Sequence, residues 1–188
     1  MTSALSGCKV AILVADGFEQ IEMTSPREAL ENAGAQTVLI SPNPDRVRGW
    51  QFTQWGDEFE VDVPVDQAEA SDYDALLLPG GLMSPDKLRR NPAVQRFVRA
   101  FFEQGKPVGS LCHGPWTLID AGVVKGRRVT SYHTVATDLR NAGAQWVDEP
   151  VVVDRGLVTS RGPDDLTAFN VKLIEAIYER RQARQRAA

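Results

Sequence analysis

The residues best suited to chemistry lie in one short segment, residues 109–115, which reads GSLCHGP. Ser110 and Gly114 stand two positions before and after Cys112. Small residues are needed there in a sharp strand-to-helix turn, because its strained backbone brings neighbouring chain close to the nucleophile. Such a turn exposes the sulfur at the carboxyl end of a strand, facing the N–H groups of the next helix, whose dipole favours the thiolate. The alternative is a buried cysteine that packs as a small hydrophobe. The adjacent His113 and a proline suited to a helix's first turn favour the nucleophile.

The elements that must position this cysteine follow from the apolar pattern. Short β-branched and apolar runs alternate with helical stretches, which is typical of a parallel, doubly wound α/β sheet. The candidate buried strands are residues 9–14, 37–40, 75–78 and 108–111.

Helix and hairpin signals fill the intervals between these strands. Residues 25–28 read SPRE, a capping-box pattern that predicts a helix beginning at Ser25 and ending near Gly34. Asn91 opens an amphipathic helix, and Pro163 starts a final helix with Leu166, Phe169, Leu173 and Ile177 inward. Antiparallel hairpins are predicted within residues 50–63 and over residues 151–160.

Polar residues follow several of the predicted strands. Ligand sites in open parallel sheets collect at the strands' carboxyl ends, which here carry residues 16–20, residues 79–81 and Cys112. A carboxyl group such as that of Glu19 could hydrogen-bond the cysteine or shuttle protons. The backbone N–H groups of Gly81 and Cys112 could bind a developing oxyanion. The alternatives are a helix N-terminal carboxylate at Glu19 and a turn that needs positive φ at the glycines.

Composition and charge exclude several classes of function. The chain has 188 residues with 43% apolar content, which fits one domain with a substantial core. A net charge of −4 and a pI near 5.3 argue against a nucleic-acid surface. The one basic cluster, within residues 180–186, is interpreted as completing and solubilising a last helix. Because residues 1–7 lack a signal peptide and no run approaches about 20 apolar residues, we expect a cytoplasmic protein without membrane contact.

Cysteine and histidine are too few for a metal centre. The two cysteines and two histidines form no CxxC or HxxxH spacing, so we predict no metal site. The glycines at positions 80 and 81 belong to no phosphate-binding or dinucleotide fingerprint, so no cofactor is predicted. Cys8 is interpreted as a core thiol that opens the first strand, and a disulfide to Cys112 is not expected in a reducing compartment.

Four segments together resemble the ThiJ/PfpI superfamily over nearly the whole chain. They are residues 14–22, 76–81, 110–115 and 159–163. With residues 130–132 and 141–148, the likeness is greatest to the PfpI-type intracellular peptidase and general stress protein branch. It implies a flavodoxin-like sandwich, with a mostly parallel sheet and small hairpin additions, over residues 1–188 as one class I glutamine amidotransferase-like domain.

The resemblance also implies roles for individual residues. Cys112 is the elbow nucleophile, and a protonated Glu19 hydrogen-bonds its sulfur. His113 is the base of a triad whose acid comes from a neighbouring subunit and corresponds here to Asp86, an aspartate where glutamate is usual, in a loop with one extra residue. The site therefore lies near the interface of a homodimer or a larger homo-oligomer.

The position of His113 raises a geometric question. Side chains at consecutive positions of a turn diverge, which argues against contact between His113 and the thiol of Cys112. The alternative base is His133, which is otherwise a solvated loop histidine, and Tyr132 beside it could line the pocket.

Family membership leaves three hypotheses for function. The first is a stress-response cysteine hydrolase in which Cys112 attacks a small carbonyl compound, a glycated adduct or a peptide, while Glu19 shuttles the proton. The second is a redox sensor that holds Cys112 as sulfenic or sulfinic acid without turnover. The third is a holdase chaperone using apolar surface around Trp50, Phe52 and Trp55, which burial at a dimer interface would also explain.

Overall fold

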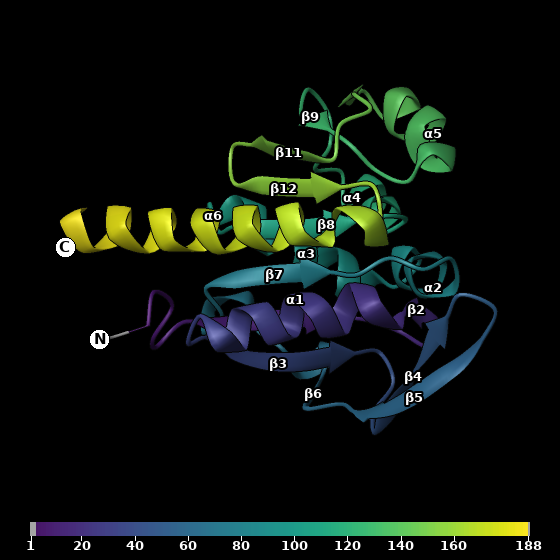
Figure 1. The fold of residues 1–188 in the computed structure, drawn as a ribbon, viewed down its shortest axis with the longest axis horizontal. Helices are drawn as coiled ribbons and strands as arrows, with labels where there is room; N and C mark the ends of the chain where they lie inside the picture. The colour runs from purple at the N-terminus through teal and green to yellow at the C-terminus, as the bar shows by residue number, and fades with distance from the viewer. Residues whose placement is uncertain (1–2, 188) are drawn as a thin grey trace.

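A computed structural model, which describes residues 3–187, places a seven-stranded sheet between two layers of helices (Figure 1). In spatial order the strands are β11 (Val151–Asp154), β12 (Leu157–Ser160), β8 (Val108–Leu111), β7 (Ala75–Leu78), β1 (Lys9–Leu13), β3 (Gln36–Ser41) and β6 (Val63–Pro64). Every neighbouring pair is parallel except β11 with β12. The smaller sheets comprise β2 (Phe18–Glu19), β4 (Arg46–Gln51) and β5 (Gln54–Glu60), and β9 (Arg128–Val129) with β10 (Gln145–Trp146).

Helices connect these strands. The α-helices are α1 (Gln20–Asn32), α2 (Met83–Arg89), α3 (Pro92–Glu103), α4 (Pro115–Asp120), α5 (Ala136–Asn141) and α6 (Leu166–Ala187). Short 3-10 helices are η1 (Val65–Gln67), η2 (Ala70–Asp72), η3 (His133–Val135) and η4 (Pro163–Asp165). Within residues 3–187 no helix combines the length and apolar character that crossing a membrane requires.

The strand order confirms the flavodoxin-like α/β prediction. The central parallel strands run β3-β1-β7-β8-β12, which is the 2-1-3-4-5 order of doubly wound flavodoxin-like sheets. The chain reverses direction across the sheet at β1, so the crevice beyond the carboxyl ends of β1 and β7 is where such folds hold their sites. All four predicted buried strands are present, as β1, β3, β7 and β8.

Each face of the sheet has its own apolar core. One core joins β1 and β7 to α1 and α6, and includes Ile12, Leu77, Leu30, Phe169 and Leu173. The opposite core packs α2, α3 and α4 on the other face, and includes Leu13, Leu76, Val94, Phe101 and Leu118. Full burial of a side chain of this size contributes about 1.5–3 kcal/mol, so these two cores hold the strand ends in place.

The first helix begins earlier than the sequence predicts. The capping-box prediction placed its start at Ser25, but α1 begins at Gln20 and contains Pro26 in its interior. Ser25 Oγ instead accepts a hydrogen bond of 3.0 Å from Asn170 of α6. An earlier start places Met23 on the buried face with Leu30, and this burial offsets much of the roughly 3 kcal/mol that an interior proline costs. The predicted end is confirmed, because Gly34 follows the helix with a φ of +94°.

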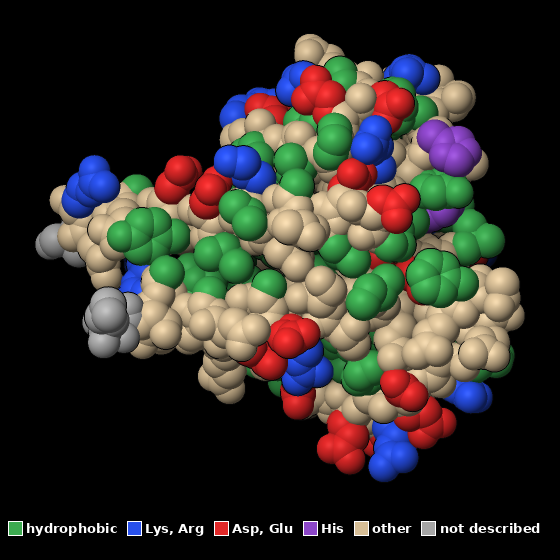
Figure 2. Space-filling view, viewed as in Figure 1, with side chains coloured by type: hydrophobic (Ala, Val, Ile, Leu, Met, Phe, Trp, Pro, Cys, Tyr) green, Lys and Arg blue, Asp and Glu red, His purple; other side chains and the backbone are tan. Residues whose placement is uncertain are grey.

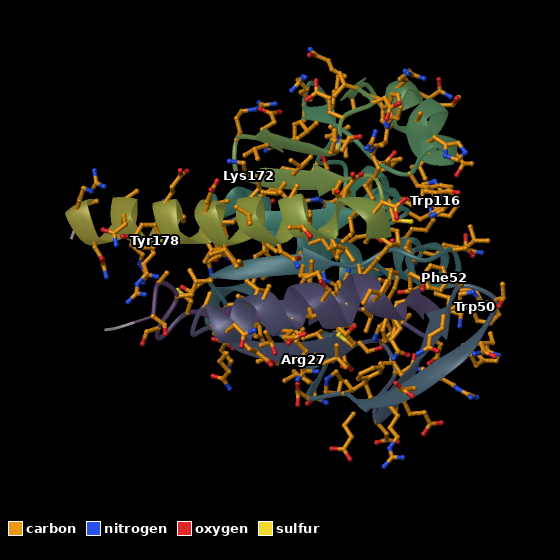
Figure 3. The ribbon with its side chains drawn as sticks, in the orientation of Figure 1. Arg27, Trp50, Phe52, Trp116, Lys172 and Tyr178 are labelled. Carbon is orange, nitrogen blue, oxygen red and sulfur yellow. The ribbon has the colours of Figure 1, made fainter. Side chains whose placement is uncertain are left out.

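The remaining helices and the second predicted hairpin are confirmed, whereas the first hairpin begins at Arg46 and ends at Glu60, ahead of the predicted residues 50–63. β11 and β12 form one hairpin, and β4 and β5 form the other, with its turn at Phe52 and Thr53. Trp50 and Trp55 pair edge to face across the β4–β5 hairpin, with ring centroids 5.4 Å apart, and Figure 3 shows Trp50 and Phe52 at its end. Asn91 caps α3 by accepting from the N–H of Ala93 at 2.9 Å. The four residues predicted to face inward from α6 are all buried.

Candidate active site

Cys112 occupies a strained turn between β8 and α4. Its φ is +57°, a left-handed conformation that costs a non-glycine residue about 1–2 kcal/mol. A side chain at Gly114 would place its Cβ 2.6 Å from the carbonyl oxygen of Leu78 and 2.7 Å from Ser110 Oγ. The sharp elbow predicted from the small residues around Cys112 is therefore present, and the close approach that requires glycine at position 114 comes from β7.

His113 does contact the sulfur of its neighbour. Its Nδ1 lies 3.2 Å from Cys112 Sγ, so the expected divergence of the two side chains is wrong. The positive φ of Cys112 turns the chain back on itself, and surrounding side chains then hold the imidazole. Tyr132 stacks on the ring with centroids 4.9 Å apart, Trp116 approaches it edge-on at 5.1 Å, and Thr134 Oγ1 lies 3.3 Å from Nε2. Burial lowers the pKa of His113, and the nearby His133 lowers it further, so the ring is neutral near pH 7.

The carboxyl group beside the sulfur belongs to Glu22. This residue is fully buried near the start of α1, and its Oε2 accepts a 2.9 Å hydrogen bond from the N–H of Gly80. Burial raises the pKa of Glu22 to about 8, against the lowering effect of hydrogen bonds from Cys112 and Gly80. Within the described chain Oε1 is buried and has no hydrogen-bond partner. Glu22 is therefore protonated at neutral pH and can donate to Sγ.

Glu19 does not hydrogen-bond the sulfur, and the assignment of that role to Glu19 is corrected. Its Oε1 accepts from the N–H of Phe52 at 3.3 Å, so its carboxyl group holds the end of the β4–β5 hairpin. Burial raises the pKa of Glu19, which the Phe52 N–H opposes. Glu19 lies at the end of β2, whereas Glu22 lies three residues further on, in the first turn of α1. The charge of Glu19 also helps to raise the pKa of Glu22.

Two backbone N–H groups approach the sulfur. They belong to Gly81 and His113, and both lower the pKa of Cys112. Burial is the larger effect and, with the negative form of Glu22, raises the pKa of Cys112 well above its ordinary value. Cys112 is therefore a thiol at neutral pH, and the thiolate expected from the helix dipole is not favoured. The predicted donor pair was Gly81 and Cys112, but the N–H of Cys112 is bound to the carbonyl of Ser160 at 3.1 Å and is not available. Gly81 can approach because it has a φ of +82° and no side chain, whose Cβ would lie 2.4 Å from the N of Glu19.

Asp86 and His133 stand apart from the sulfur in the described chain. Asp86 is exposed on α2, and no hydrogen bond joins it to His113 within residues 3–187. A contact from a second subunit stays a prediction. His133 is exposed and lies against Tyr132, with ring centroids 4.4 Å apart, so Tyr132 contacts both histidine rings.

A cavity of about 410 Å3 lies beside the site. One wall is formed by residues 131–133 and the other by Asp148 and residues 161–165. Tyr132 connects the cavity to the nucleophile, because its ring stacks on His113 and its N–H donates to the carbonyl of Cys112 at 3.0 Å. Arg161 in this cavity hydrogen-bonds Asp148 at 3.0 Å and Asp165 at 2.8 Å. Across the described residues, no group of three or more His, Cys, Asp or Glu side chains is arranged to hold a metal ion.

The fold and this cysteine define a class of protein: a flavodoxin-like α/β protein with a nucleophile elbow at the carboxyl edge of its sheet. The sequence profile of the DJ-1/PfpI family matches residues 8–176, and the chain belongs to that family.

Relatives of known sequence and structure agree with this assignment. A putative cysteine protease, YraA of Bacillus subtilis, is 47% identical over 163 residues, which cover 86% of this chain and 94% of that protein. An oxidized DJ-1 of Toxoplasma gondii superposes with a TM-score of 0.82 at 28% identity, covering 95% of each chain. A two-domain protein of Anabaena variabilis, with DJ-1/ThiJ/PfpI-like and ferritin-like domains, gives a TM-score of 0.84 at 38% identity, covering 89% of this chain and 47% of that one.

Proposed function

We propose that this protein is a cytoplasmic, stress-response cysteine hydrolase in which Cys112 attacks the electrophilic carbon of a small carbonyl compound, a glycated adduct or a peptide. One observation carries the proposal: Cys112 Sγ lies at a strained elbow, 3.2 Å from His113 Nδ1 and beside the Glu22 carboxyl group. A nucleophile within reach of a base that is itself held by neighbours is the signature of covalent catalysis. The name of the Bacillus subtilis relative, a putative cysteine protease, supports the same class of reaction.

With a peptide as substrate, the site supplies an acceptor or a donor for each proton transfer. The thiol proton passes to His113 Nδ1 as Sγ bonds to the carbonyl carbon, and the N–H groups of Gly81 and His113 stabilise the charge that develops. The imidazolium returns the proton to the departing amine. Water then attacks the thioester, which releases the acid and restores the thiol. Protonated Glu22 donates to the sulfur while it is negative, the role first assigned to Glu19.

The proposal retains the oligomer implied by the family resemblance. In a homodimer or larger homo-oligomer, Asp86 of a neighbouring subunit would orient His113 from the side opposite the sulfur. The exposed position of Asp86 on α2 allows such a contact. Asp86→Asn should then lower kcat while leaving KM and the oligomeric state unchanged.

Steady-state turnover by matched cysteine variants tests the hydrolase. Wild type, Cys112→Ser and Cys8→Ser are assayed on methylglyoxal, a glyoxal-derived adduct and a fluorogenic peptide, with reduced thiols verified by intact mass. We expect turnover of at least one substrate, abolished by Cys112→Ser and retained by Cys8→Ser. Absence of turnover by reduced wild type, or its survival in Cys112→Ser, would refute the hydrolase.

The second candidate function is the redox sensor. The donors directed at sulfur favour it, because the N–H groups of Gly81 and His113 and protonated Glu22 would stabilise a sulfinate as well as a thiolate. A sensor gains the mass of one or two oxygens at Cys112 under mild peroxide and turns over no substrate.

Under the third hypothesis, the holdase chaperone, suppression of client aggregation would survive Cys112→Ala. The exposure of Phe52 (71%) and Trp55 (43%) on the β4–β5 hairpin supports that holdase reading.

A further inference from the structure

A second cavity, of about 550 Å3, lies at the opposite edge of the sheet from Cys112. It is formed where the chain enters β1, where it enters β8, and along the last turns of α6. Figure 1 shows the carboxyl end of α6 beside the N-terminal segment, at the far end of the molecule from the β4–β5 hairpin. The ionisable residues and the thiol that line the cavity are Cys8, Asp74, Lys106, Arg180, Arg181 and Arg184.

The charge of this cavity is opposite to that of the protein. Four cationic side chains face one carboxylate, an excess of three positive charges in a chain of net charge −4. Figure 2 shows basic side chains at this end of the molecule, over the end of α6. Burial lowers the pKa of Lys106; the carboxylates of Asp74 and Asp72 oppose this lowering, and the charges of Arg184 and Arg180 add to it. The cations therefore repel one another, and a bound anion would relieve this repulsion.

Three of the four basic groups are held in place without an ion pair, and the fourth, Arg184, pairs with Asp74. Three of them each donate to one backbone carbonyl: Lys106 to Ala70 (2.6 Å), Arg180 to Gln104 (3.2 Å) and Arg181 to Ala4 (3.0 Å). Arg184 lies 3.8 Å from Asp74, whose other carboxylate oxygen accepts the N–H of Lys9. A guanidinium has five N–H donors and an ammonium has three, so each group keeps donors for a ligand. Solubility alone does not require cations to converge on a cavity from separate segments.

We propose that this cavity binds a small multivalent phosphate anion, at a site separate from the cysteine centre. Guanidinium groups match the paired oxygens of phosphate, and the three excess charges match a diphosphate better than a single carboxylate. The carboxyl end of α6 contributes about half a negative charge, which is small against this excess. The volume of about 550 Å3 and the negative charge of the whole chain favour a small ligand over a nucleic acid.

Cys8 provides a probe for occupancy of the cavity. It is one of only two cysteines in the chain, so Cys112→Ser leaves it as the single thiol. It lines the cavity and interacts with Arg181. Cys8 is itself buried, with 4% of its surface exposed, so iodoacetamide alkylates it only when the cavity wall opens locally. Pyrophosphate bound to the arginines would stabilise the closed wall and slow this alkylation.

The test combines calorimetry with thiol labelling, and pyrophosphate is the probe. In the Cys112→Ser protein we expect saturable pyrophosphate binding that weakens about ten-fold in Arg180→Gln/Arg184→Gln. Arg186→Gln is the matched control, because Arg186 lies on the same helix and does not line this cavity. Pyrophosphate should also slow Cys8 alkylation several-fold, and this measurement uses the protein with all its arginines.

Three results would overturn the proposal. They are no saturable binding of pyrophosphate, an equal loss of binding in Arg186→Gln, and equally tight binding of citrate. The first would leave the cluster as a solvated basic surface. The second would indicate a general charge effect, and the third would indicate a site for anions that does not select phosphate.

Discussion

Replacing Glu22 by glutamine should make the protein more stable near neutral pH. Burial raises the pKa of Glu22 from 4.5 to about 8 in the folded protein. Between these values only the folded state keeps the proton, so unfolding releases it, and the free energy of unfolding falls as the pH rises. Glutamine matches the shape of the protonated carboxyl group and does not ionise when the chain unfolds.

The magnitude follows from the two pKa values. One unit corresponds to about 1.4 kcal/mol, so between about pH 5 and pH 7.5 the wild type should lose about 3 kcal/mol relative to Glu22→Gln. The amide nitrogen takes the place of Oε1, a buried position without a hydrogen-bond partner among the described residues, which costs about 1–3 kcal/mol at every pH. The variant should therefore be less stable near pH 5 and equal or more stable near pH 7.5.

Urea unfolding at several pH values measures this difference, with reducing agent present and protomer concentration fixed. Glu28→Gln is the matched control, since Glu28 is an exposed glutamate on the same helix. Its replacement should change the free energy of unfolding by less than about 0.5 kcal/mol at either pH. A Glu22→Gln difference that stays constant with pH, or that moves in the opposite direction, would show that Glu22 is not a neutral buried acid.

Three further predictions concern the elbow. In a Cys8→Ser background, Glu22→Gln should speed alkylation of Cys112 above about pH 8 by about ten-fold, because the ionised carboxylate no longer raises the pKa of the thiol; a slower rate would contradict this. Gly114→Ala should cost at least about 2 kcal/mol in urea unfolding, because its Cβ meets the Leu78 carbonyl; a cost below 0.5 kcal/mol would refute the close approach. Cys112→Gly should be about 1 kcal/mol more stable than Cys112→Ala, because glycine adopts the φ of +57° without strain; equal stabilities would count against a strained elbow.

Most of the fold was predictable because each parallel strand is a short apolar run bounded by turn residues. Strands β7 and β8 begin and end at the predicted residues, and so does the hairpin of β11 and β12. The elbow was predictable from local sequence because small residues flank Cys112. The tight approach at Gly114 comes partly from Ser110 within the turn and partly from Leu78 of β7, which only the fold brings close. The second oxyanion donor was not predictable, because the N–H of Cys112 donates to the carbonyl of Ser160 in β12, a residue distant in sequence.

The carboxyl group beside the sulfur was assigned to Glu19 from the family resemblance, and the misplaced start of α1 gave no reason to consider Glu22. With a helix beginning at Ser25, Glu22 lies in a loop. Glu19 then stands among the polar residues 16–20 that follow the first strand, where the family resemblance placed the acid. A helix through residues 20–32 puts Glu22, Pro26 and Leu30 at intervals of four, all on the buried face. An acidic residue in an apolar stripe has a strongly raised pKa, and such residues gather at functional sites. That periodicity was present in the sequence, and the proline obscured it because a proline ordinarily marks a helix's first turn. The apolar spacing on both sides of Pro26 is therefore the signal that identifies Glu22 as the acid of this site.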